Sequence, residues 1–127
     1  MTSLALLAVG GAFGAVARYR MATWVQRRIG PGFPWGTLAV NTLGSFALGF
    51  LLAAVGAHPL RPVIVMLLAT GFLGDFTTFS TFAYEAAALG HARAWGRLTA
   101  YLVGTSAATM AAVGAGLWLG GVIERWM

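Results

Sequence analysis

The chain has 127 residues, of which 59% are hydrophobic and only 9% are charged, and it contains no cysteine. A soluble domain carries roughly a quarter of its residues as charged side chains, so the composition excludes a water-soluble enzyme. The lack of cysteine excludes disulfide scaffolds, thiolate metal sites and cysteine nucleophiles. We therefore interpret the chain as an integral membrane protein in contact with membrane lipid.

Four apolar segments follow one another along the chain, and each is long enough to cross a bilayer as a helix, which takes about 20 residues. They cover about 3–26, 35–57, 62–90 and 98–123. The loops Arg27–Pro34 and His58–Pro62 are rich in residues that break helices, and His91–Arg97 is a short basic loop. No basic residue precedes the first segment and no clean cleavage site follows it, which favours a span over a signal peptide. We expect a single four-helix transmembrane domain over 1–127.

The eight basic residues are all arginines, and the net charge is +5. On a soluble domain this balance would suggest a nucleic-acid partner. Here the arginines flank the apolar segments, which is typical of anchoring at the membrane interface, so we expect no nucleic acid. One predicted side carries Arg27, Arg28, Arg93 and Arg97, and the other carries Arg61 and Arg125. So small a bias is a weak orientation signal, and it is compatible with insertion in both orientations.

Small residues recur at intervals of four in three segments, a pattern that lets membrane helices pack closely. The sets are Gly10 and Gly14; Ser45, Gly49 and Ala53; and Gly116 and Gly120. Close packing of this kind can serve the interior of one subunit or the interface of a dimer. We favour a dimer, because the polar residues described next need shielding from lipid.

Three predicted helices each carry a polar stripe. The stripes are Thr37, Asn41 and Ser45; Thr77, Thr81 and Glu85; and Tyr101, Thr105 and Thr109. Residues four apart share one helix face. A single serine or threonine in a membrane helix often bonds its own backbone. Three aligned stripes instead favour a shared polar track.

The segment Thr70–Phe82 combines glycines, an aspartate, hydroxyls and phenylalanines. A break of the third helix near 74–77 would free backbone carbonyls, which suit a small cation, and amides, which suit an anion. Phe79 and Phe82 share a face, and the positive edges of their rings could coordinate a small anion. From spacing alone, phenylalanines that pack or face lipid remain the simpler interpretation.

Three motifs stand in order along the chain. They are Gly10–Tyr19 (GGAFGAVARY), Gly36–Phe46 (GTLAVNTLGSF), and Gly71–Gly74 (GFLG) followed by Thr77–Phe82 (TTFSTF). Together they resemble the Fluc (CrcB-type) fluoride channels, and the likeness in length, spans and motif order covers essentially the whole chain. The resemblance implies a non-enzymatic channel in the prokaryotic plasma membrane that exports fluoride passively from the cytoplasm and protects against its toxicity. It also implies an antiparallel, dual-topology homodimer with two pores and a structural sodium ion (Na+) at its centre.

The resemblance also implies roles for individual residues. Phe79 and Phe82 would be the rings that meet fluoride, and Asn41 would donate its side-chain amide along the pore. The remaining pore residues would be Ser80, Thr81, Glu85, Tyr101 and Thr105. The backbone carbonyls of Gly74 and Thr77, from both subunits, would hold the sodium ion. Arg18 matches the first-helix arginine of the family.

Asp75 departs from the family pattern, in which this position is usually small or neutral. A carboxylate beside a central cation could strengthen cation binding. Two copies facing each other across a two-fold axis would instead repel, and one could hold a proton. Both outcomes stay open.

Two other functions compete with the channel. A dual-topology, proton-coupled multidrug exporter of the small four-helix type would use Glu85 or Asp75 as its titrating carboxylate. It would leave the phenylalanine–hydroxyl segment unexplained. A non-transporting membrane assembly subunit is favoured only if the polar stripes are buried packing.

Overall fold

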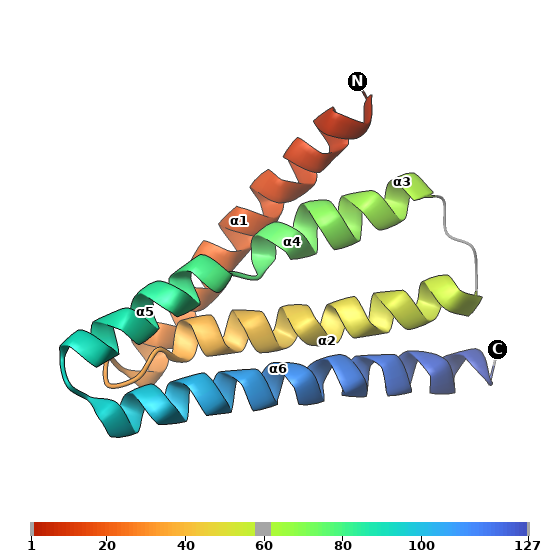
Figure 1. Cartoon of the computed structure of the whole chain (residues 1–127). Coiled ribbons are helices and arrows are strands. Elements are labelled where there is room, and N and C mark those ends of the chain that lie inside the picture. The colour runs from red at the N-terminus through yellow and green to blue at the C-terminus, as the bar shows by residue number, and fades with distance from the viewer. Residues whose placement is uncertain (1, 58–61, 127) are drawn as a thin grey trace.

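The computed structural model describes residues 2–57 and 62–126, and the regular elements there are all helices (Figure 1). They are α1 (Thr2–Ile29), α2 (Trp35–Ala57), α3 (Pro62–Val65), the π-helix η1 (Met66–Leu73), α4 (Gly74–Phe76), α5 (Phe79–His91) and α6 (Trp95–Glu124). Four stretches are long and apolar enough to span a membrane: Leu4–Ile29, Trp35–Val55, Pro62–His91 and Trp95–Ile123. The predicted all-helical chain with four long apolar helices is confirmed.

The helix ends differ from the predicted ones at the first loop and at the basic loop His91–Arg97. The first helix continues through Arg27 and Arg28 to Ile29, because basic side chains are favourable at a helix C-terminus. Gly30 follows with φ 115°, a conformation that glycine adopts without strain. Likewise α5 includes His91 and α6 already begins at Trp95. The predicted break His58–Pro62 lies, apart from Pro62, outside the described residues.

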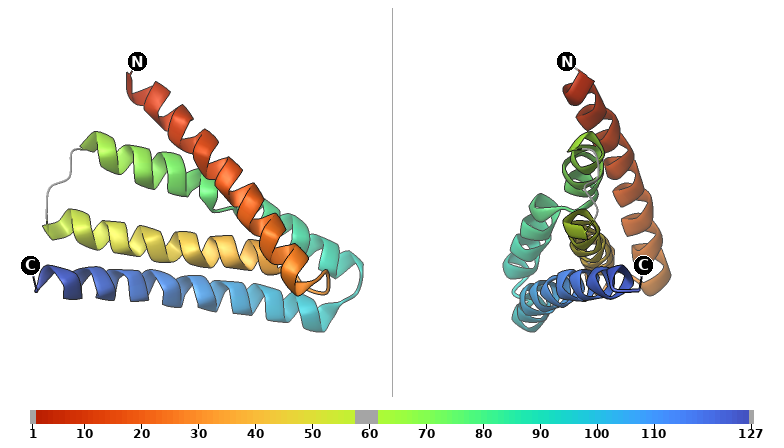
Figure 2. Two further views of the ribbon diagram at one scale, coloured as in Figure 1. Left: turned by 180° about the vertical axis from the view of Figure 1, so that it is seen from behind. Right: turned by 90° about the vertical axis from the view of Figure 1, so that its right-hand side faces the viewer.

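The helices α2 and α6 run side by side along the length of α2 (Figures 1 and 2). Glycines allow this approach, since a Cβ on Gly49 would meet the carbonyl of Val113 and a Cβ on Gly116 would meet the carbonyl of Phe46. On the other side of α2, α1 crosses the third span, with Gly14 against the backbone of Phe72. The small-residue motifs thus pack helices within one protomer, so the predicted dimer does not rest on them.

The third span is not a continuous α-helix. Its first part is mainly the π-helix η1, and the chain is extended at Thr77 (ψ 159°) and Thr78 (φ −148°) between α4 and α5. The break predicted near 74–77 therefore lies at Thr77–Thr78, while Gly74 itself is helical (φ −60°, ψ −42°). The depth of this break in a membrane stays a prediction.

Candidate functional site

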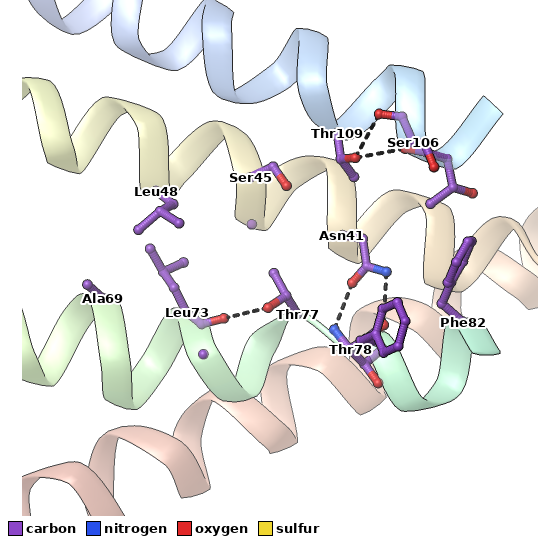
Figure 3. Close-up of a pocket in the computed structure, with 14 residues that line it drawn as sticks. Asn41, Ser45, Leu48, Ala69, Leu73, Thr77, Thr78, Phe82, Ser106 and Thr109 are labelled. Atoms are coloured by element: carbon purple, nitrogen blue, oxygen red, sulfur yellow. Dashed lines mark hydrogen bonds between the residues drawn. The ribbon is translucent and has the colours of Figure 1, made fainter. Parts of the chain in front are cut away.

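Asn41 on α2 holds the interruption of the third span through both ends of its amide (Figure 3). The backbone N–H of Thr78 donates to Asn41 Oδ1 at 2.7 Å, and Asn41 Nδ2 donates to Thr78 O at 3.0 Å. Both residues are buried. A buried peptide group without partners is costly, so this asparagine makes the extended conformation of Thr78 tolerable.

The interruption frees backbone carbonyls from the helical ladder, among them those of Gly74 and Thr77. In a continuous helix Gly74 O would accept from the N–H of Thr78, which here donates to Asn41. Thr77 O would accept from the N–H of Thr81, which here donates to Thr78 Oγ1 at 3.2 Å. In place of that bond, Thr77 O accepts from Arg18 Nη1 at 3.2 Å. The predicted cation ligands are thus freed carbonyls, and one of them also binds a guanidinium.

Thr78 starts the second half of the span as the N-cap of α5. Its hydroxyl accepts from the N–H of Thr81 and donates to Thr81 Oγ1 at 2.9 Å, and Ser80 Oγ lies 3.4 Å away. Threonine is a favoured N-cap because its oxygen pairs with an otherwise unpartnered amide. The hydroxyls of the motif therefore serve first to cap the helix.

A cavity of about 380 Å³ opens beside the interruption, between the third span, α2 and α6 (Figure 3). Its lining consists of Asn41, Gly44, Ser45, Leu48, Ala69, Leu73, Gly74, Thr77, Thr78, Phe79, Phe82, Thr105, Ser106 and Thr109. Thr105 is 4% exposed, and its hydroxyl oxygen has no hydrogen-bond partner among the described residues. Most buried hydroxyls are paired, and among the described residues this oxygen and that of Thr42 are the exceptions.

Aromatic rings continue the line of the cavity along α5 and α6. The Phe79 and Phe82 ring centroids lie 6.0 Å apart, and Phe82 lies 5.0 Å from the ring of Tyr101. Tyr101 is fully buried, and its hydroxyl donates to Glu85 Oε2 at 2.6 Å. This hydrogen bond fixes the Glu85 carboxylate, which lies one helical turn after Phe82 on α5, to Tyr101 on α6.

Comparison with known proteins decides the family. The model of the family described as CrcB-like protein, Camphor Resistance (CrcB), matches residues 5–117. The chain belongs to the CrcB family. Curated relatives named fluoride-specific ion channel FluC include one from Agrobacterium fabrum, 48% identical over 94% of this chain and 97% of the relative. Others are from Rhizobium etli (49% identical; 92% and 94% covered) and Geobacillus kaustophilus (FluC 1; 46% identical; 78% and 81% covered).

The family expected from the three motifs is therefore confirmed, and with its four spans this CrcB-family chain is an integral, multi-pass membrane protein. The predicted site residues divide among three places. Asn41, Gly74, Thr77, Phe79, Phe82 and Thr105 line the 380 Å³ cavity, and Tyr101 and Glu85 continue beyond it. Arg18 and Thr81 instead line a second cavity of about 210 Å³, between α1, α2 and the interruption. Ser80 is exposed.

Two residues of this CrcB-family site carry roles that the sequence did not assign. Thr78 is both the N-cap of α5 and the hydrogen-bond partner of Asn41, and a threonine directly before an apolar helical segment is a recognisable N-cap signal. Ser106 lines the cavity beside Thr105, off the expected stripe. Asp75 is exposed on α4, and its carboxylate lies against α1, where a Cβ on Gly11 would meet Asp75 Oδ2.

Proposed function

We propose that this CrcB-family chain is a fluoride-selective ion channel that lets fluoride leave the cytoplasm passively. The observation that carries the proposal is the single cavity that Asn41, Phe79, Phe82 and Thr105 line together. The relatives named fluoride-specific ion channels, similar over nearly the whole chain, support it. The exporter alternative has no such support.

The chemistry of the cavity suits a small, strongly hydrated anion. Fluoride gives up water only where several donors replace it. The Thr105 hydroxyl supplies one, and the second N–H of Asn41, which the bond to Thr78 leaves over, supplies another. Phenylalanine ring edges carry partial positive charge. Because all these donors are neutral, they bind the anion weakly enough to release it.

The direction of transport follows from acid–base chemistry. Neutral hydrogen fluoride crosses a bilayer, ionises in the less acidic cytoplasm and is trapped there as fluoride. A passive path for the ion lets it leave down its own gradient and protects the cell, with no energy source needed.

A second copy of the chain completes this arrangement in our proposal. Phe79 is 80% exposed and the hydroxyl-bearing Ser80 and Thr81 are also exposed on α5. Exposed polar groups in a membrane segment favour a protein partner over lipid. The weak arginine bias of the loops supports an antiparallel pair inserted in both orientations, with two pores.

Sodium at the centre of that dimer is also proposed. The donor set fits, because Gly74 O and Thr77 O are freed carbonyls of the kind that bind sodium in broken membrane helices. Two carbonyls from one protomer are too few, so the site needs the same pair from the second copy. Arg18 uses one lone pair of Thr77 O and leaves the other. A bound sodium ion would supply positive charge that joins the two interrupted helices.

Liposome efflux tests the channel. Purified protein in vesicles loaded with potassium fluoride should release fluoride rapidly once valinomycin lets potassium follow, as read by a fluoride electrode. Vesicles loaded with potassium chloride should retain chloride. If fluoride stays inside while a proton gradient drives export of a cationic dye, the chain is an exporter and the channel proposal is wrong.

Sodium removal tests the cation site. Replacing sodium by N-methylglucamine should weaken the dimer, measured by light scattering in detergent, or lower the fluoride flux. A dimer and a flux that are both indifferent to sodium would count against this site.

A further inference from the structure

A third cavity, of about 350 Å³, lies at the end of the bundle where the α1–α2 loop, the end of α5 and the start of α6 converge (Figures 1 and 2). Its lining consists of Gln26, Pro31, Gly32, Phe33, Pro34, Glu85, Ala88, Leu89, Ala92 and Arg97. Glu85 and Arg97 are the charged members of this lining. The fluoride and sodium sites proposed above use neither Arg97 nor this loop.

Side-chain contacts link this end cavity to the cavity of the proposed fluoride path. Phe82 belongs to the lining of the 380 Å³ cavity, and its ring lies 5.0 Å from that of Tyr101. The Tyr101 hydroxyl is bonded to Glu85, and Glu85 lines the end cavity. A chain of contacts therefore runs from Phe82 through Tyr101 to the Glu85 carboxylate at the end cavity.

The wall of the end cavity is held in place by Gln26. Its side-chain Nε2 donates to Gly30 O at 2.6 Å and to Phe33 O at 3.0 Å, and its Oε1 accepts from the N–H of Gly36 at 3.1 Å. The fixed loop places the Phe33 ring edge-on against Tyr101, with centroids 5.5 Å apart. These hydrogen bonds fix the α1–α2 loop, which forms the rim of the end cavity.

Arg97 is the cation on that rim. It is exposed, and its Nη1 donates to Gly32 O at 3.1 Å. A guanidinium has five N–H donors, so this bond leaves others for an anion. An anion that leaves the path at Glu85 meets a negative charge, and a positive charge across the cavity offsets that repulsion.

We propose that the end cavity is one mouth of the fluoride path, an inference that rests on the proposed channel. Arg97 attracts the anion there and offsets the repulsion from the Glu85 carboxylate. The attraction acts through the charge of Arg97, over a distance, without a direct contact. It therefore weakens as salt shortens the Debye length, from roughly 30 Å at about 10 mM to 3 Å at about 1 M.

The test compares fluoride efflux from liposomes at these two ionic strengths, set with the salt of a large organic anion. Arg97→Gln keeps a donor for Gly32 O but removes the charge. It should lower the flux at low salt by roughly twofold to fivefold and leave it near wild type at high salt. Arg97→Glu should lower it further, and Arg97→Lys should retain most of it. Elution as an intact dimer checks folding of each variant.

Arg125→Gln is the matched control, because Arg125 is also exposed on the end of α6 and also bonds a backbone carbonyl, that of Gly121. It should conduct as wild type at both ionic strengths. A loss in Arg97→Gln that is equal at low and high salt would show a role in loop structure and overturn the proposal, as would unchanged flux at low salt. Absence of fluoride flux in the wild type would instead overturn the channel itself.

Discussion

Asn41 and Thr78, 37 residues apart, exchange two hydrogen bonds, so that one side-chain amide takes the place of helical backbone partners. Asn41→Asp keeps the acceptor for the Thr78 N–H but turns the donor into a carboxylate facing Thr78 O. We expect fluoride flux to fall at least tenfold, which is about 1.4 kcal/mol on the barrier, because a negative charge then faces the anion path. Liposome efflux and thermal melting in detergent measure the two effects. Wild-type flux in this variant would place the path away from Asn41.

Phe82→Ile keeps an apolar side chain but removes the ring that contacts Tyr101 and lines the cavity. We expect a loss of flux of about tenfold or more without loss of the dimer. Phe72→Ile is the control, since Phe72 stacks on Phe76 at 5.7 Å outside the cavity lining. Equal loss of flux in both variants would mean that ring packing, rather than ring contact with fluoride, matters.

Thr105→Val removes a hydroxyl that has no partner among the described residues. Because an unpaired buried hydroxyl does not stabilise the fold, we expect the melting temperature to hold or rise while fluoride flux falls severalfold. Thr42→Val matches it, since Thr42 Oγ1 is also buried and has no partner in the described part of the chain, but Thr42 lines a largely apolar groove. Thr42→Val should conduct normally. A Thr105→Val channel with normal flux would remove Thr105 from the path.

Tyr101→Phe deletes the hydroxyl that donates to Glu85 at 2.6 Å and leaves the ring in place. Hydrogen bonds between membrane helices contribute about 0.6 kcal/mol on average, so we expect a small loss of stability and a clear loss of flux. A double-mutant cycle with Glu85→Gln, read by melting, should show coupling between the two residues. Tyr84→Phe is the control, because Tyr84 is 75% exposed. Additive effects in the cycle would contradict a functional pair.

Gly116→Ala adds a Cβ that would meet Phe46 O on α2, whereas Gly114→Ala, on the same helix, adds one with no neighbour within 4 Å. We expect Gly116→Ala to destabilise the protomer by about 1–3 kcal/mol through overpacking. Gly114→Ala should leave it unchanged or slightly more stable, because alanine favours helix. Unfolding in mixed micelles compares them. Equal stability of the two variants would mean that α2 and α6 can separate at no cost.

The four spans were predictable because length and apolar composition are local signals, and the three motifs were enough to indicate the family. The position of the interruption was predicted only in part, since the predicted range 74–77 overlaps the extended residues at Thr77. Gly71 and Gly74, on which that prediction rested, both remain helical. The chain opens at Thr77–Thr78, where Asn41 and Arg18 supply partners from 37 and 59 residues away.

In the site, too, positions fixed by helical spacing were predictable, and contacts between distant segments were not. Asn41 and Thr105, from two of the predicted stripes, line one cavity together with Phe79 and Phe82, because helical spacing fixes which residues share a face. Thr81 lines a different cavity, since its backbone is tied to the cap at Thr78. No local sequence pattern indicates the three hydrogen bonds of the Gln26 side chain, because their partners are set by how the α1–α2 loop folds back.

The π-helix η1 makes residue count in the third span as consequential as residue identity. Its hydrogen bonds join residues five apart, so the eight residues Met66–Leu73 wind more loosely than an α-helix would. Deleting one residue there would let the segment relax to an α-helix. The looser winding would be lost, and with it part of the register that sets Thr77 against Arg18 and Thr78 against Asn41. The length of Met66–Leu73 should therefore matter as much as its sequence.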